Sequence, residues 1–134
     1  MSVEIDHMGL SVSDLAAAKT FYAAALKPLR IRVMLEFPKS VTGTYDVIGF
    51  GVDGKAFFWL SEAGKTTPPV HLAFRSEDRA QVDAFHVAAL AAGGADNGAP
   101  GVREMYHPTY YGAFVLDPDG NNIEAVCHAP AGGE

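Results

Sequence analysis

The chain has 134 residues, of which 49% are hydrophobic and 19% are charged, so it can build a core and is not disordered by composition. A net charge of −6 without any Lys/Arg cluster argues against a surface that binds nucleic-acid phosphates. No apolar run approaches the ~20 residues of a membrane span. The N-terminus lacks a signal-peptide pattern, and the single cysteine, Cys127, forms no internal disulfide. These features predict a soluble, cytoplasmic protein without a nucleic-acid or membrane partner.

An internal repeat organises the sequence. An offset of 64 residues places His7–Asp14 over His71–Asp78, and toward the end of each copy the offset drifts to 66. The shared order and spacing predict two copies of one unit. Module 1 covers residues 1–64 and module 2 covers residues 68–128, with a linker at 66–69 and a frayed tail at 129–134.

Each module is predicted to contain one strand, one helix and three further strands. In module 1 a strand at 3–12 precedes a helix that begins at a Ser13 or Asp14 cap and runs to about Leu26, where Pro28 stops it. The strands that follow are expected at 29–37, 44–52 and 55–61, the last two joined by a tight Asp53-Gly54 turn.

In module 2 the same order is expected: a strand at 70–75, a helix at 77–92, and strands near 101–106, 111–116 and 121–128. The predicted fold class is α+β, with two βαβββ modules that form a curved mixed sheet, a half-barrel around a cavity, and with helices on the outside.

Strand parity places three candidate metal ligands on the face away from the helices. Alternate side chains of a strand point to opposite faces, which puts His7, His71 and Glu124 opposite the bulky apolar residues of their strands. Two imidazoles and a carboxylate can hold Fe, Mn, Ni, Co or Zn and leave positions open for substrate. A lone histidine at a strand start is more often a surface residue, but both histidines occupy the same position of the repeat.

Two segments resemble the signatures of a known superfamily. Ile5–Leu15, followed by Phe21-Tyr22, resembles the opening of vicinal oxygen chelate proteins, and Asp117–Glu124 resembles their closing signature. This is the superfamily of glyoxalase I, fosfomycin-resistance enzymes, extradiol dioxygenases and bleomycin-resistance proteins. The resemblance covers essentially the whole chain and implies a single glyoxalase-like domain that commonly dimerises, so we expect a homodimer.

The resemblance also implies metal ligands on the first, fifth and last strands, which match His7, His71 and Glu124. Glyoxalase I has a fourth ligand, at the position of the first module that corresponds to the last ligand in the second module. Counting four residues beyond each hairpin glycine leads from Gly120 to Glu124 and from Gly54 to Phe58. Because phenylalanine cannot bind a metal, Phe58 is expected to face substrate instead, and glyoxalase I activity is not expected.

Further candidates surround this set. Arg75 and Arg103 are the available cations for an acidic substrate group. The segment from Tyr106 to Gly112 concentrates three tyrosines and a histidine. Within it His107 is the predicted proton-transfer group and Tyr111 the predicted oxyanion donor, while Tyr106 and Tyr110 are expected to contact substrate. An aromatic plug or a dimer contact is the alternative for this loop.

Other reactive side chains are interpreted as structural. We expect His86 on the surface or in packing, His128 exposed rather than ligating, Cys127 in the core and Trp59 in packing.

Three hypotheses remain open from the sequence. The first is a metal-dependent lyase, dioxygenase or resistance-type transferase acting on a small oxygen-rich molecule. The second is a metal-free protein that sequesters a small or cationic drug, as bleomycin-resistance proteins do. The third is a degenerate domain that serves only in assembly.

Overall fold

The computed structural model describes residues 2–131, so residues 132–134 of the predicted frayed tail lie outside the described part. The first module begins with strand β1 (Met8–Ser11) and helix α1 (Leu15–Leu26), which continues into a short 3-10 helix at Lys27–Leu29. It then contains β2 (Arg32–Phe37), the one-turn helix α2 (Lys39–Thr42), β3 (Val47–Val52) and β4 (Lys55–Ser61).

The second module repeats this plan. Its elements are β5 (His71–Arg75), α3 (Arg79–Ala91), β6 (Ala95–Val102), β7 (Tyr111–Leu116) and β8 (Asn122–Cys127). The two sheets have the matching orders β1-β4-β3-β2 and β5-β8-β7-β6, and the first pair of each is parallel. The predicted α+β class with two curved-sheet modules is therefore confirmed, and the sheets stay open rather than closing into a barrel.

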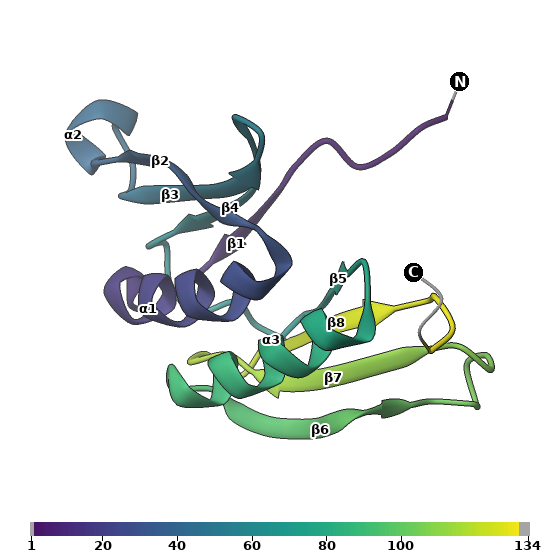
Figure 1. Ribbon diagram of the computed structural model, residues 1–134. Helices are drawn as coiled ribbons and strands as arrows, with labels where there is room; N and C mark the ends of the chain where they lie inside the picture. The colour runs from purple at the N-terminus through teal and green to yellow at the C-terminus, as the bar shows by residue number, and fades with distance from the viewer. Residues whose placement is uncertain (1, 132–134) are drawn as a thin grey trace.

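Both long helices start where an aspartate caps the first turn. Asp14 accepts a hydrogen bond from the backbone N–H of Ala17, and Asp78 accepts one from that of Gln81. Figure 1 shows α1 and α3 between the two sheets, where they pack against each other. Each sheet therefore has one face buried by its helix and one face, called here the open face, turned outward, so the helices lie between the sheets and not on the outside as expected.

One core joins the modules. It includes Phe21 and Phe58 from module 1 together with Phe74 and Phe85 from module 2, all less than 10% exposed. Phe58 meets Phe74 edge to face, with 5.5 Å between the ring centroids. The side chains that bind the two modules are thus apolar and aromatic, which is the usual source of folding stability in such a core.

A β-bulge corrects the predicted partner of Glu124. The β3–β4 register passes from Gly51↔Ala56 to Phe50↔Phe58, so the strand carries one extra residue at Phe57. Beyond the bulge Trp59 pairs with Gly9, just as Glu124 pairs with Ala73 in module 2. Trp59, not Phe58, is consequently the structural mate of Glu124.

The strand predicted near 101–106 is wrong in its position. The structure has β6 at Ala95–Val102, and residues beyond it turn back toward β7. The sequence of β6 is rich in Gly, Pro, Asn and Asp, which argues against a strand. It forms nonetheless because β6 is an edge strand, where Pro100 can lack a backbone N–H without losing a bond to a second neighbour. The register of β6 along β7 also shifts twice.

The closing signature has a structural role at the junction of the modules. Asp117, only 5% exposed, accepts hydrogen bonds from the backbone N–H groups of Asp119 and Asn121 and so holds the turn before β8. Its other oxygen accepts the Tyr22 hydroxyl of α1 at 2.5 Å. This bond fastens the helix of one module to the turn of the other. None of the helices among residues 2–131 is long and apolar enough to cross a membrane.

Candidate active site on the open face of module 2

The site begins with His71 of β5 and Glu124 of β8, which come together because the two strands pair in parallel. His71 Nε2 lies 3.0 Å from Glu124 Oε1. The other imidazole nitrogen, Nδ1, lies 3.0 Å from the backbone oxygen of Asn122, which can only accept a hydrogen bond. In the neutral imidazole the proton is therefore on Nδ1, and the lone pair of Nε2 faces the carboxylate.

Two acceptors 3.0 Å apart repel each other unless a proton or a cation lies between them. The carboxylate of Glu124 is also 1% exposed, and a buried charge needs compensating partners. A donated Nδ1–H with a free Nε2 is the arrangement that metal-binding histidines adopt in proteins. The donor chemistry of this pair therefore fits a divalent cation.

Tyr110 covers the second oxygen of Glu124. Its hydroxyl donates to Glu124 Oε2, and burial together with this contact raises the pKa of Tyr110 well above its ordinary value. The pair lines a cavity of about 390 Å³, formed by His71, Tyr106, His107, Tyr110, Phe114 and Glu124. Gly112 makes room for the carboxylate, since a Cβ there would lie 3.0 Å from Glu124 Oε2.

His107 lies in the same cavity, but both of its ring nitrogens have partners. The backbone N–H of Thr109 donates to Nδ1 at 3.2 Å, and Nε2 lies 2.8 Å from His128 Nδ1. His128, which we expected to be exposed, is thus partly buried beside His107 rather than free in solvent. The geometry gives His107 a role in holding this loop over Glu124.

The other predicted ligand, His7, is on the other module. Its Nδ1 lies 2.7 Å from the Asp6 carboxylate, whose second oxygen accepts from Lys55. Hydrogen bonds from Lys55 and then from His7 lower the pKa of Asp6. Asp6 thereby fixes the His7 proton on Nδ1 and leaves Nε2 free, as in His71. Among residues 2–131 no three His, Cys, Asp or Glu side chains gather as a metal-binding group, so His7 does not join the pair within one chain.

Two other sequence candidates lie away from the cavity. Phe58 is 1% exposed in the shared core and packs against Tyr22 and Phe74, because the bulge turns it to the helix side. Tyr111 also faces the helix: its hydroxyl donates to Asp83 of α3 at 2.6 Å, and the Arg79 guanidinium stacks on its ring. The structure thus does not place either residue with His71 and Glu124.

The two candidate arginines occupy different places. Arg103 donates to the backbone oxygens of Ala99 and Gly101 and lies over the Phe114 ring, so its charge is engaged at the edge of the cavity. Arg75 is exposed at the end of β5 and lines a neighbouring cleft with His128.

The sequence analysis interpreted His128 as exposed and assigned no role to Asp6. His128 shares strand parity with Glu124, which is a usable signal, and only the backward turn of the Tyr106–Tyr110 loop brings His107 to it. Asp6 directly precedes His7, and this spacing alone does not predict the contact between their side chains.

Known proteins provide an independent comparison. The family model described as Glyoxalase/Bleomycin resistance protein/Dioxygenase superfamily matches residues 4–125. No curated protein matches the chain. A solved glyoxalase/bleomycin resistance protein from Albidiferax ferrireducens is 27% identical, with 90% of this chain and 95% of that one covered and a TM-score of 0.70.

Two further structures share the fold. A glyoxylase/bleomycin resistance protein/dioxygenase domain from Frankia sp. is 19% identical, with 95% and 98% coverage and a TM-score of 0.71. A glyoxalase I mutant from Zea mays is also 19% identical, with a TM-score of 0.70; 91% of this chain aligns with 46% of that longer one. The chain therefore belongs to the Glyoxalase/Bleomycin resistance protein/Dioxygenase superfamily.

Proposed function

We propose that this protein is a divalent-metal-dependent enzyme, a lyase, dioxygenase or resistance-type transferase, that acts on a small oxygen-rich molecule. The observation that carries the proposal is the His71–Glu124 pair. His71 Nε2 and the buried Glu124 carboxylate face each other at 3.0 Å, while His71 Nδ1 is committed to the Asn122 backbone oxygen. A cation between them removes the repulsion and completes the charge balance of Glu124.

We propose His7 of a second copy as the third ligand. Its imidazole has the same protonation as His71, with Nδ1 held by Asp6 and Nε2 free, and its side chain is 61% exposed. The residues before it reach away from the body of the protein, and Val3 and Ile5 in this segment are 100% and 85% exposed (Figure 1). An exposed apolar arm that carries a ligand is suited to docking on a partner, which supports a homodimer with shared sites.

A bound Fe, Mn, Ni, Co or Zn ion would supply a Lewis acid that holds two neighbouring substrate oxygens and stabilises negative charge on them. Tyr110 would keep a proton on its hydroxyl next to Glu124, since burial and Glu124 raise its pKa further above neutral pH. Phe114 and Tyr106 would contact the body of the substrate and reduce its contact with water. The buried, unpaired Cys127 thiol fits a reducing cytoplasm.

Metal titration of chelator-free protein tests the proposal. Calorimetry with Fe²⁺, Mn²⁺, Ni²⁺, Co²⁺ or Zn²⁺ should give one site per chain, and His71→Ala should abolish it. The matched control is His86→Ala, because His86 also contacts a carboxylate, Asp96, at 3.0 Å but lies outside the cavity. Absence of binding to any of the five ions, or equal loss in both variants, would refute a metal centre.

A second candidate function rests on the open face of module 1. There Trp59 stacks on Phe37, with 6.4 Å between ring centroids and an interplanar angle of 12°, and Trp59 takes the place of a fourth ligand. Such a surface suits a metal-free protein that sequesters a planar or cationic drug. Drug binding that persists unchanged after metal removal and in His71→Ala would favour this function over the enzyme.

A further inference from the structure

We propose that Arg75 and His128 form a carboxylate-binding subsite beside the His71–Glu124 pocket, so that the substrate carries a carboxylate remote from its metal-binding oxygens. The proposal rests on the proposed function for its link to a substrate. The subsite itself follows from one chain of hydrogen bonds and one cleft.

The hydrogen bonds fix where the protons are. The backbone N–H of Thr109 can only donate, so His107 Nδ1, 3.2 Å away, carries no proton. Neutral His107 therefore has its proton on Nε2 and donates it to His128 Nδ1 at 2.8 Å. Neutral His128 in turn has its proton on Nε2. The chain of hydrogen bonds thus makes Nε2 the N–H donor of neutral His128.

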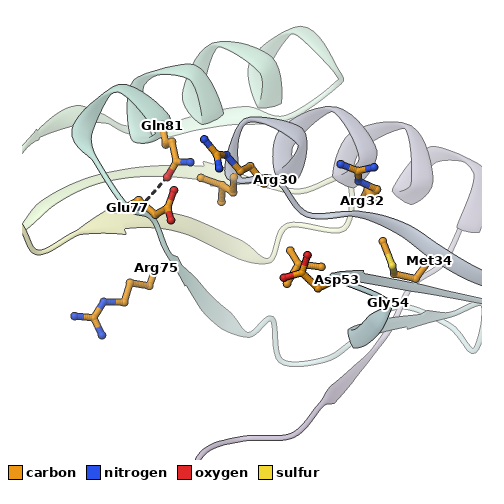
Figure 2. Close-up of a pocket in the computed structure, with 10 residues that line it drawn as sticks. Arg30, Arg32, Met34, Asp53, Gly54, Arg75, Glu77 and Gln81 are labelled. Carbon is orange, nitrogen blue, oxygen red and sulfur yellow. Dashed lines mark hydrogen bonds between the residues drawn. The ribbon is translucent and has the colours of Figure 1, made fainter. Parts of the chain in front are cut away.

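A cleft of about 400 Å³ lies beside His128. It is lined by Arg75, Ser76, Glu77, His128 and Ala129. Figure 2 shows the Glu77 side chain directed toward Gln81 and Arg30, and the Arg75 side chain directed the opposite way. Arg75 and Glu77 form no ion pair among residues 2–131, and neither the Arg75 guanidinium nor His128 Nε2 has a hydrogen-bond partner there.

The charge of the subsite selects a monoanion. Arg75 supplies one positive charge, and the Glu77 carboxylate, which also lines the cleft, is directed away from the Arg75 side chain (Figure 2). Burial, His107 and Arg75 lower the pKa of His128 against the opposing effect of Glu124, so the imidazole is neutral at pH 7. A guanidinium fork with one additional N–H matches the two oxygens of a carboxylate. A phosphate dianion would leave a negative charge without a partner.

The position of the subsite connects it to the metal pocket. His71, Ala73 and Arg75 share the open face of β5, and the register pairs Ala73 with Glu124 and Arg75 with Val126. Arg75 is therefore about 7 Å along the sheet from the level of Glu124, and the His128 ring lies 5.4 Å from the ring of Tyr110, whose hydroxyl contacts Glu124. A small molecule can span this distance with a chelating end and an acidic end.

The test is an NMR titration of metal-free ¹⁵N-labelled protein with sodium acetate at pH 7.5 and constant ionic strength. We expect saturable shifts of the His128 Nε2 and Arg75 Nε signals. Arg75→Gln, which keeps an amide but removes the charge, should weaken binding at least tenfold, and His128→Phe should weaken it severalfold. Arg32→Gln is the matched control because Arg32 of β2 is also exposed but does not line the cleft of Arg75 and His128, so this variant should change nothing.

Equal weakening by Arg75→Gln and Arg32→Gln would overturn the proposal, since binding would then follow net charge alone. Tighter binding of inorganic phosphate than of acetate would overturn the carboxylate assignment. A His128 ring protonated on Nδ1 would overturn the hydrogen-bond argument. Because this titration contains no metal, its outcome is independent of the calorimetry, so failure of the subsite and failure of the metal centre are distinguishable.

Discussion

The hydrogen bond between Tyr22 and Asp117 makes a strong prediction about how the modules are held together. The Tyr22 side chain is fully buried, and its hydroxyl donates at 2.5 Å to a carboxylate that is itself 5% exposed. Tyr22→Phe keeps the ring and its contacts with Phe21 and Phe58 and deletes only this donor. A hydrogen bond to a charged group contributes about 1.5–3 kcal/mol, so the free energy of unfolding should fall by that amount.

The pH dependence of the same bond gives an independent check. Burial first, and then the charge of Asp117, raise the pKa of Tyr22 far above the ordinary value of 10.0. A group with a raised pKa in the folded state stabilises the protein below its unfolded pKa and loses that contribution as the pH rises above it. Above pH 10 the free energy of unfolding of the wild-type protein should therefore fall by about 1.4 kcal/mol per pH unit relative to that of Tyr22→Phe.

Urea denaturation followed by circular dichroism measures both effects. Tyr45→Phe is the control because Tyr45 is 46% exposed. A loss below about 0.5 kcal/mol in Tyr22→Phe, the usual range of a surface substitution, would refute the reasoning. If the free energy of unfolding fell equally with pH above pH 10 in the wild-type protein and in Tyr22→Phe, the assignment of the raised pKa to Tyr22 would be refuted.

Other substitutions test the shape of the site. Gly112→Ala places a Cβ 3.0 Å from Glu124 Oε2 and should weaken metal binding roughly tenfold; Gly9→Ala, with nothing within 4 Å of its Cβ, should leave the affinity in calorimetry unchanged. Tyr110→Phe should remove part of the late-titrating tyrosinate absorbance, because the pKa of Tyr110 is raised by burial and by Glu124; an unchanged alkaline titration curve would contradict this.

The repeat and strand parity predicted much of the fold and the closeness of His71 to Glu124. His71 and Glu124 lie on adjacent strands with their functional atoms in contact, as parity requires. Counting four residues beyond each hairpin glycine placed Phe58 wrongly because a bulge at Phe57 adds one residue to β4, and a one-residue shift moves every following side chain to the other face. Composition alone does not reveal a bulge.

The sequence also did not predict which tyrosines of the Tyr106–Tyr111 segment contact the site. Tyr111 begins β7 with its hydroxyl on the helix side, while Tyr110, one residue earlier, reaches Glu124. The order of residues does not determine which of two adjacent tyrosines faces the cavity when the strand start is uncertain by one position. The β6 error has a different cause: β2 shifted by the repeat offset of 64 covers 96–101, inside β6, whereas the prediction near 101–106 did not follow the repeat.

Mixing two inactive variants tests the central claim, that the metal site joins His7 of one copy to His71 and Glu124 of another. His7→Ala and Glu124→Ala homodimers should each bind metal poorly. After unfolding and co-refolding in equal amounts, mixed dimers would contain one intact site, and about a quarter of all sites should recover tight binding. No recovery, with mixed dimers confirmed by native mass spectrometry, would contradict a site shared between copies.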